Sequence, residues 1–153
     1  MWWKNQEPST CCEKVIIKED NWIFVAETNE ARIALQVVSC GKHLWEFGGM
    51  GHCQTSLNTT EYYDDVTDKW TKSNSTIEKR RGHRAVAFRQ EVYVIGGDGG
   101  HALLSSAEKL DTTTGQWTAL RSMAVGRFSF GAAITEHKLY CFGGTIGGEC
   151  GIF

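Results

Sequence analysis

The sequence contains little proline, no long hydrophobic segment and no marked excess of either charge. Pro8 is the single proline in 153 residues, which is few for a chain rich in loops. With 16 basic and 18 acidic residues the formal net charge is −2, so the charge does not favour a nucleic acid or an anionic membrane as a partner. No apolar run approaches the roughly 20 residues of a membrane helix, and the first residues lack the apolar stretch of a signal peptide. We therefore expect a single cytosolic or nuclear domain.

Cysteine is present, but without the spacing of a metal site or a disulfide framework. None of the six cysteines forms a C-x-x-C pair or shares a zinc-like spacing with another. A chain of this length can build its own core without disulfides, so we expect reduced, half-buried thiols that act as small hydrophobes. They are Cys11, Cys12, Cys40, Cys53, Cys141 and Cys150.

Three residue types recur at one regular interval along the chain. In each series the second copy follows the first by 48 residues, and the third follows the second by 47. A period near 50 with a double glycine and a tryptophan is typical of a β-propeller blade. The series are Gly48-Gly49, Gly96-Gly97 and Gly143-Gly144; Trp22, Trp70 and Trp117; and Arg32, Arg80 and Arg127.

The middle unit reads as four antiparallel strands that become more polar along the chain. Small apolar residues at 83–88 predict the innermost strand, and the β-branched run 92–95 predicts a buried second strand that ends at the double glycine. The segments 106–110 and 116–120 predict a third and a fourth strand, of which the last faces water. We expect positive φ at the glycines and packing of each tryptophan against a neighbouring blade.

The other units repeat this order, and the first and last of them are incomplete. At the front, Glu13–Ile16 aligns with Glu61–Asp64, and Trp22 closes a leading half-unit. The predicted fold class is therefore all-β, a partial β-propeller with two full four-stranded antiparallel blades and two terminal half-blades. The predicted division is a half-blade at 9–26, blades at 32–74 and 80–120, and a half-blade at 127–145.

These repeats resemble the kelch motif, from about Ser9 to about Thr145. The shared features are the double glycine after the second strand, an acidic third strand that ends in Tyr63-Asp64, a tryptophan six or seven residues later, and an arginine ten residues beyond it. The segment 104–111 is most similar to repeats of BTB-kelch proteins. Leu110 stands in place of the usual tyrosine, and the prolines common in the turns of the family are absent.

The resemblance implies a β-propeller, commonly of six blades, that binds other proteins. Many members of the family are substrate receptors for cullin-type ubiquitin ligases, and others bind actin. Within these 153 residues we expect neither a BTB nor a BACK domain, and we expect fewer blades than a closed ring requires. We expect the open blade edges to be completed by a longer parent chain, to be partly disordered, or to cause self-association between two copies.

The repeated arginines are the first candidates for contact with a partner. Arg32, Arg80 and Arg127 occupy the connection from an outer strand to the next inner strand, which in kelch propellers lies on the partner-binding face. Arg81 and Arg84 extend Arg80 into a basic cluster, which favours an acidic partner segment. The alternative interpretation is that the three arginines bond to backbone carbonyls between blades and that the cluster is a solvated loop.

The loops after the double glycines form a second candidate surface, because loops on a rigid scaffold often carry binding specificity. Its candidate residues are His52, Asp98 and His101. His52 and His101 with Cys53 have the chemistry of metal ligands, but loop histidines are more often plain polar residues, and we predict neither a metal site nor a cofactor. No helix follows these glycines, so they do not indicate a phosphate-binding loop.

A protein-interaction module, and not an enzyme, is the leading interpretation, because no nucleophile with its base and no pair of catalytic carboxylates is recognisable. The alternative is a kelch-propeller enzyme, either a copper-radical oxidase or a sugar-modifying enzyme. Tyr62 and Tyr63, with the loop histidines and Cys53, supply the residue types of such an oxidase without its arrangement. A third interpretation is an incomplete fragment without independent function.

Three tryptophans lie outside the repeating series. We expect Trp45 in the core, and we expect Trp2 and Trp3 either to contact a partner or to pack where a missing blade would lie.

Overall fold

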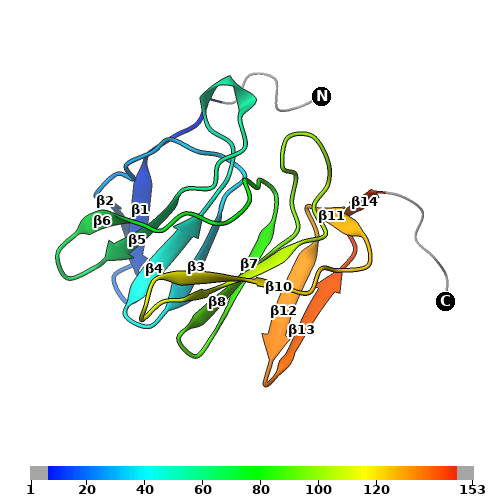
Figure 1. Cartoon of the computed structure of the whole chain (residues 1–153). Helices are drawn as coiled ribbons and strands as arrows, with labels where there is room; N and C mark the ends of the chain where they lie inside the picture. Colours follow the sequence, from blue (N-terminus) through cyan, green and yellow to red (C-terminus); the bar gives the residue numbers. More distant parts are fainter. Residues whose placement is uncertain (1–6, 148–153) are drawn as a thin grey trace.

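The computed structural model describes residues 7–147, which form antiparallel β-sheets joined by tight turns and longer loops (Figure 1). The leading half-blade is the hairpin of β1 (Cys12–Ile16) and β2 (Asn21–Val25). Blade 1 contains β3 (Gln36–Cys40), β4 (His43–Phe47), β5 (Thr60–Asp64) and β6 (Lys69–Ser73). Blade 2 contains β7 (Arg84–Phe88), β8 (Glu91–Ile95), β9 (Ala107–Asp111) and β10 (Gln116–Leu120).

The trailing half-blade follows blade 2 and pairs β12 (Gly131–Thr135) with β13 (Lys138–Phe142). A short ladder joins β11 (Gly126–Phe128) to β14 (Thr145–Gly147), and one 3₁₀ turn, η1 (His52–Gln54), lies in the loop after β4. Two four-stranded sheets and two hairpins confirm the predicted fold class, a partial β-propeller. Trp2, Trp3 and Cys150 lie outside the described residues.

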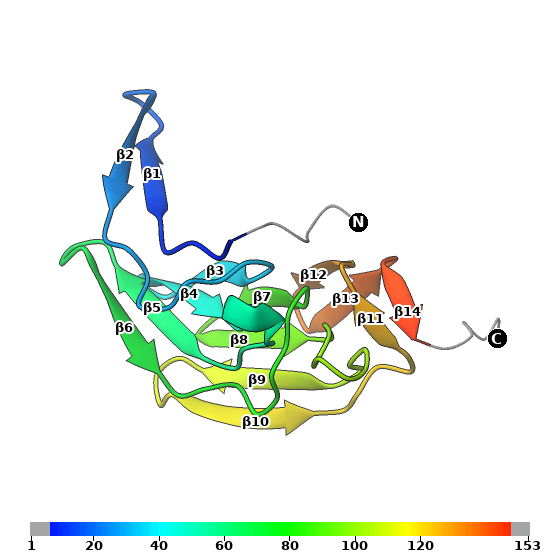
Figure 2. The same cartoon turned by 90° about the horizontal axis from the view of Figure 1, so that it is seen from above.

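The innermost strands of successive units lie beside one another. β7 contacts β3 on one side and β12 on the other, and Figure 2 shows these strands near the centre with β6 and β10 outside. The leading half-blade stands away from blade 1 in the same view. By the repeat interval β1 and β2 correspond to β5 and β6, so the leading half-blade supplies third and fourth strands and the trailing half-blade supplies first and second strands.

The core lies between blade 1 and blade 2. Trp45 and Phe47 of β4 are buried against Val92 and Val94 of β8 and against Leu110 of β9. These side chains alternate along their strands, so each sheet presents an apolar face to its neighbour. The expectation that Trp45 is a core residue is confirmed, since only 4% of it is exposed.

The double glycines adopt the predicted left-handed backbone. Gly48 and Gly49 have φ of 51° and 98°, and Gly96 and Gly97 have φ of 60° and 99°. In blade 2 the turn brings the chain back against the neighbouring connection, where the Gly97 N–H donates to the Arg127 carbonyl at 2.7 Å. The turn therefore ties each second strand to the unit that follows it.

The repeated tryptophans form one kind of contact where a preceding unit is present. The Trp70 indole N–H donates to the Ala26 carbonyl at 3.0 Å, and that of Trp117 donates to the Asn74 carbonyl at 2.8 Å. The Trp117 ring also meets Phe47 of blade 1 edge-on. Trp22, which follows no earlier unit in the 153 residues, is 63% exposed.

Trp117→Ala is expected to lower the free energy of unfolding by about 3 kcal/mol, the lower end of the range for a buried tryptophan, because the ring is half-buried. Trp70→Ala should cause a similar loss, since the two indoles make equivalent hydrogen bonds. Urea denaturation followed by circular dichroism measures both. Val66→Ala is the control, since Val66 is exposed in a turn. A loss at Trp117 no larger than at Val66 would contradict the prediction.

The described cysteines are all free thiols, and burial raises the pKa of Cys12, Cys40 and Cys141. Between residues 7 and 147, no helix has the length and apolar character needed to cross a membrane.

Candidate functional site

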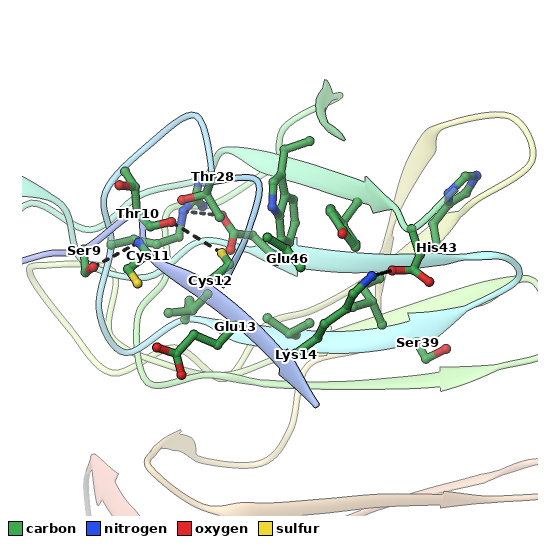
Figure 3. Close-up of a pocket in the computed structure, with 18 of the residues that line it drawn as sticks. Ser9, Thr10, Cys11, Cys12, Glu13, Lys14, Thr28, Ser39, His43 and Glu46 are labelled. Carbon is green, nitrogen blue, oxygen red and sulfur yellow. Dashed lines mark hydrogen bonds and ion pairs between the residues drawn. The ribbon is translucent and has the colours of Figure 1, made fainter. Parts of the chain in front are cut away.

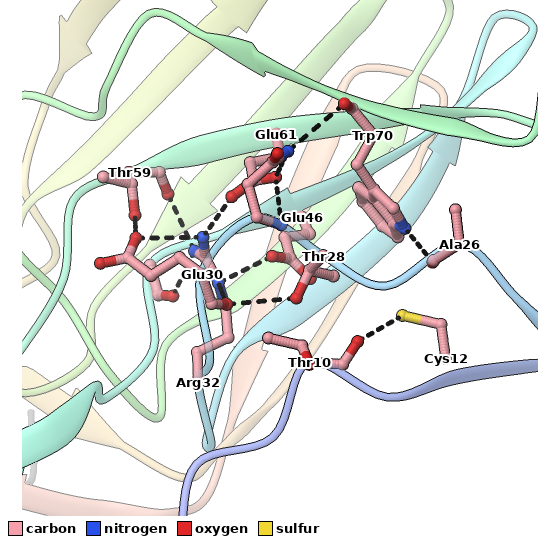
Figure 4. Close-up of polar contacts among 12 residues, drawn as sticks. Thr10, Cys12, Ala26, Thr28, Glu30, Arg32, Glu46, Thr59, Glu61 and Trp70 are labelled. Carbon is pink, nitrogen blue, oxygen red and sulfur yellow. Dashed lines mark hydrogen bonds and ion pairs between the residues drawn. The ribbon is translucent and has the colours of Figure 1, made fainter.

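Arg32 lies in the connection between the leading half-blade and blade 1, and the structure buries it (Figure 4). Its Nε is 2.7 Å from Glu46, and its Nη2 is 3.1 Å from Glu61. Its Nη1 donates to the Gly48 carbonyl at 2.9 Å. Glu61, on the third strand, also accepts hydrogen bonds from the backbone and side-chain nitrogens of Asn29. A buried cation thus binds the double-glycine turn to the third strand.

Arg80 repeats this arrangement in blade 2 and is fully buried. Its Nη1 donates to the Gly96 carbonyl at 2.7 Å, and its Nη2 pairs with Glu108 on the third strand. Glu108 also accepts from the backbone N–H groups of Ile77 at 2.6 Å and Glu78 at 3.0 Å. The Nε of Arg80 is unpaired among the described residues, because Val94 occupies the position that Glu46 holds in blade 1.

Arg127, in the trailing unit, makes the carbonyl contact but not the carboxylate contact. Its Nη1 donates to Gly143 at 2.8 Å, as Arg32 and Arg80 donate to their glycines. Among residues 7–147 no carboxylate lies within ion-pair distance of Arg127, and its side chain is half-buried. The three arginines share one structural role, of which Arg127 fulfils only part.

The structure buries two of the arginines that the sequence analysis proposed as contacts with a partner. Arg32 and Arg80 point into the protein, so their guanidinium groups bind the fold instead of a partner in this structure. The basic cluster around Arg80 is also dispersed: Arg81 pairs with Asp98, and Arg84 donates to the His83 carbonyl. The surface here is therefore less basic than the sequence suggested, and a test of this surface must leave Arg80 in place.

Glu61 and Glu108 are structural residues that the sequence predictions missed. Both lie on third strands, which were expected to be polar, yet both glutamates are buried. The signal was present, because Glu13, Glu61 and Glu108 follow the same 48 and 47 intervals as the arginines. A repeated arginine with a repeated glutamate indicates an ion pair inside each blade.

A carboxylate and an imidazole in the interior, those of Glu46 and His83, have strongly shifted pKa values. Burial raises the pKa of Glu46 from 4.5 to about 7, against the opposing effect of Arg32 and with a further increase from Glu61 and Glu30. His83 shifts in the opposite sense, because burial lowers its pKa to about 3. His83 occupies the position that Leu35 and Phe130 hold in the adjacent units, so it acts as a neutral core residue.

Stability is expected to depend on pH through Glu46. The folded protein keeps this proton up to about pH 7, whereas the unfolded chain releases it near pH 4.5. The stability that protonation confers is therefore complete below pH 4.5 and is lost as pH rises through 7, a decrease of at most about 3 kcal/mol. Urea denaturation from pH 4.5 to 8 should show this decrease in the wild type and not in Glu46→Gln. Glu19→Gln, at an exposed turn, is the control, and an equal slope in Glu46→Gln would contradict the assignment.

One end of the blades carries a pocket shared by several successive units. The loops after β4 and β8 and the connections between units meet there, because antiparallel order brings these strand ends to one side. The cavity has a volume of about 360 Å³. It is lined by Ile33, Ala34, Met50, Gln54, Arg81, Asp98, Leu103 and Phe128.

The polar wall of this pocket is the Arg81–Asp98 pair. Nε and Nη2 of Arg81 donate to one Asp98 oxygen at 3.0 and 2.7 Å, and Nη1 donates to the Gln54 carbonyl at 3.1 Å. Burial disfavours the charge of Asp98, but hydrogen bonds from Gly100 and Arg81 outweigh it and lower the Asp98 pKa. The structure therefore brings Arg81 and Asp98, two of the predicted site residues, together as an ion pair beside an apolar cavity.

The remaining predicted residues do not line this cavity. His52 and His101 are exposed in the loops after β4 and β8, and Arg84 begins β7. In residues 7–147 no group of three or more histidine, cysteine, aspartate or glutamate side chains is placed to hold a metal ion. The structure thus does not assemble His52, His101 and Cys53 into such a site.

The comparisons with known proteins agree with this architecture. A Kelch motif profile matches residues 31–75 and 79–124. The chain is 26% identical over 134 residues to Kelch repeat protein M-T8 of Myxoma virus (strain Lausanne), covering 85% of this chain and 26% of that protein. It is 32% identical over 128 residues to human Kelch-like protein 38, with coverages of 80% and 22%. For Kelch-like protein 25 of Xenopus tropicalis the identity is 26% over 128 residues, with coverages of 84% and 22%.

The chain spans about a quarter of the length of these relatives. The matched profile covers more than half of the 153 residues, and each match includes one complete four-stranded sheet with its double glycine, tryptophan and buried arginine. The repeat interval, the blade topology and the sequence comparisons all indicate one family, and the chain belongs to the kelch-motif proteins.

Proposed function

We propose that this chain is a protein-interaction module and that its partner binds at the pocket lined by Arg81 and Asp98. The observation that carries the proposal is the pocket itself, in which loops and connections of successive units converge on one cavity of about 360 Å³. Binding specificity commonly resides in loops held by a rigid scaffold, and the buried arginine–glutamate pairs provide that rigidity.

The composition of the pocket defines the partner segment. Ile33, Met50, Leu103 and Phe128 offer an apolar surface that fits one apolar side chain. Arg81 lies beside it and its guanidinium has the geometry for a carboxylate, although Asp98 now occupies that position. We therefore expect a segment with an apolar residue next to an acidic residue, whose carboxylate competes with Asp98 for Arg81.

Two more specific partners follow from the resemblance to BTB-kelch proteins. The first is a substrate of a cullin-type ubiquitin ligase, recognised by the propeller as part of a larger assembly. The second is actin. Co-sedimentation with purified filamentous actin separates them, because only the second predicts binding to filaments without other proteins.

Selection from a displayed library of random peptides tests the proposed surface. Wild-type protein should enrich peptides that combine an apolar and an acidic residue, and binding should fall at least tenfold for Leu103→Lys and for Arg81→Gln. Val66→Lys is the matched control, since Val66 is an exposed aliphatic residue in the turn at the opposite end of β5. Peptides that bind Leu103→Lys as well as wild type would place the binding surface elsewhere.

A further inference from the structure

We propose that two copies of this 153-residue chain assemble into one propeller, with β12 and β13 of one copy pairing with β1 and β2 of the other in a four-stranded blade. The two half-blades are complementary parts of the same unit: one contains first and second strands, and the other contains third and fourth strands. By the register of β4 with β5 and β8 with β9, Cys141 would lie opposite Glu13 of the second copy.

The strongest support is the incomplete arginine site in the trailing unit. In blade 2, the third-strand carboxylate of Glu108 accepts from Arg80 and from the backbone N–H groups of residues 77 and 78. The equivalent groups in the trailing unit are Arg127 and the N–H groups of residues 124 and 125. No carboxylate of the described part of the chain accepts from these donors. The site is formed except for one glutamate.

Glu13 is the glutamate that fits this site. It pairs with Phe24 across its hairpin as Glu61 pairs with Lys72 and Glu108 pairs with Ala119, so it has the same place on a third strand. Glu13 is exposed, and Figure 3 shows its carboxylate without a contact to the residues around it. One end of the chain therefore has the donors of the site, and the other end has the acceptor.

The apolar surfaces of the two ends also match. Tyr140 and Phe142 of β13 are stacked and are 40% and 60% exposed. Their counterparts in blade 1, Trp45 and Phe47, are 4% and 0% exposed because blade 2 covers them. The chain has a cavity of about 590 Å³ between its leading half-blade and blade 1 (Figure 3). In the proposed dimer, this cavity of one copy would receive Tyr140 and Phe142 of the other. Its lining includes Val37, whose equivalent in blade 2 is buried against blade 1.

The exposed Trp22 indole of one copy also has a candidate hydrogen-bond acceptor near the trailing half-blade of the other. Trp70 and Trp117 each donate to a carbonyl in the connection that precedes their blade. By the same intervals, the acceptor for Trp22 is the carbonyl of Arg121 in a second copy. Arg121 borders a cavity of about 410 Å³ that is also lined by Ile95 and Leu139, which would receive the exposed indole.

The number of copies follows from the number of blades. Each copy has two full blades, and two copies joined at both ends share two composite blades, which makes six. Propellers typically close with about four to eight blades, whereas three copies would make about nine. A head-to-tail interface closes into a ring when its rotation permits, so we expect a closed dimer.

Light scattering after size-exclusion chromatography tests the proposal over a wide range of concentrations. The wild type should have twice the mass of one chain at micromolar concentration, and Glu13→Lys and Arg127→Glu should each have the mass of one chain. Glu19→Lys, on the same hairpin and exposed, should stay dimeric. A wild-type mass of one chain at every concentration would overturn the proposal, as would dimers of both interface variants.

Mixing the two variants separates a lost interface from a lost fold. An equimolar mixture of Glu13→Lys and Arg127→Glu should form a heterodimer, because one composite blade has the native pair and the other has the reversed but still opposite charges. Circular dichroism should show wild-type strand content in each variant alone. A mixture that stays monomeric while both variants are folded would overturn the proposal.

Discussion

Replacing Arg80 with methionine is expected to lower the free energy of unfolding by about 3–5 kcal/mol, the usual cost of breaking a buried ion pair. Arg80 is fully buried, and its loss leaves the Glu108 carboxylate without a cation in the interior. It also removes the donor to the Gly96 carbonyl, which connects the double-glycine turn of blade 2 to the third strand. Urea denaturation followed by circular dichroism measures the loss.

A second variant shows whether the unpaired charge is the cause. Glu108→Gln in the Arg80→Met background removes the charge and keeps an acceptor for the N–H groups of Ile77 and Glu78. The double variant should therefore be more stable than Arg80→Met alone by at least about 1 kcal/mol. A single-variant loss below about 1 kcal/mol, or no recovery in the double variant, would contradict the role assigned to this pair.

Gly97→Val is expected to unfold blade 2. Gly97 has φ of 99°, a conformation that a β-branched residue resists. A Cβ there would lie 2.7 Å from the Arg81 carbonyl and 2.9 Å from the His83 Cβ, so backbone and a fully buried side chain would both have to move. The strain and the overlap together should exceed about 4 kcal/mol, a loss large enough to remove the cooperative unfolding transition.

Gly131→Val is the matched control for that prediction. Gly131 lies in β12 without a positive φ, and a Cβ there would be 3.7 Å from its nearest neighbour, the Phe142 carbonyl. We expect its unfolding free energy to stay within about 0.5 kcal/mol of wild type. A cooperative transition with wild-type midpoint in Gly97→Val would show that the turn tolerates a side chain.

Much of the fold could be predicted because the repeat is marked by residue types that few other residues can replace at the same structural position. A double glycine with positive φ, a tryptophan that spans two blades and a β-branched second strand each leave a clear mark at a fixed interval. In the middle unit the predicted strand ends differ from the observed ones by at most one residue, as at Arg84, which begins β7 where His83 was expected. His83 is instead fully buried between glycines of the two blades.

The candidate site was predictable only in part, because the sequence does not show which charged groups meet. Arg80 and Arg81 are neighbours in the chain, yet one is buried with Glu108 and the other lines a pocket with Asp98. Adjacent residues point to different sides of an extended chain, and that difference decides which guanidinium is buried. The convergence of Ile33, Met50 and Leu103 on one cavity likewise depends on how the blades lean on one another.

The kelch repeat, the number of strands at each end and the positions of the turns are all encoded locally, in conformational preferences that recur at a regular interval, and so they could be inferred from the amino-acid order alone. The folded protein was needed to show which arginines are structural, which ion pair lines a pocket and how Arg127 differs from its two counterparts. Burial and pairing of a charge depend on groups far apart in the chain, which meet only when the third strand folds against the connection between units.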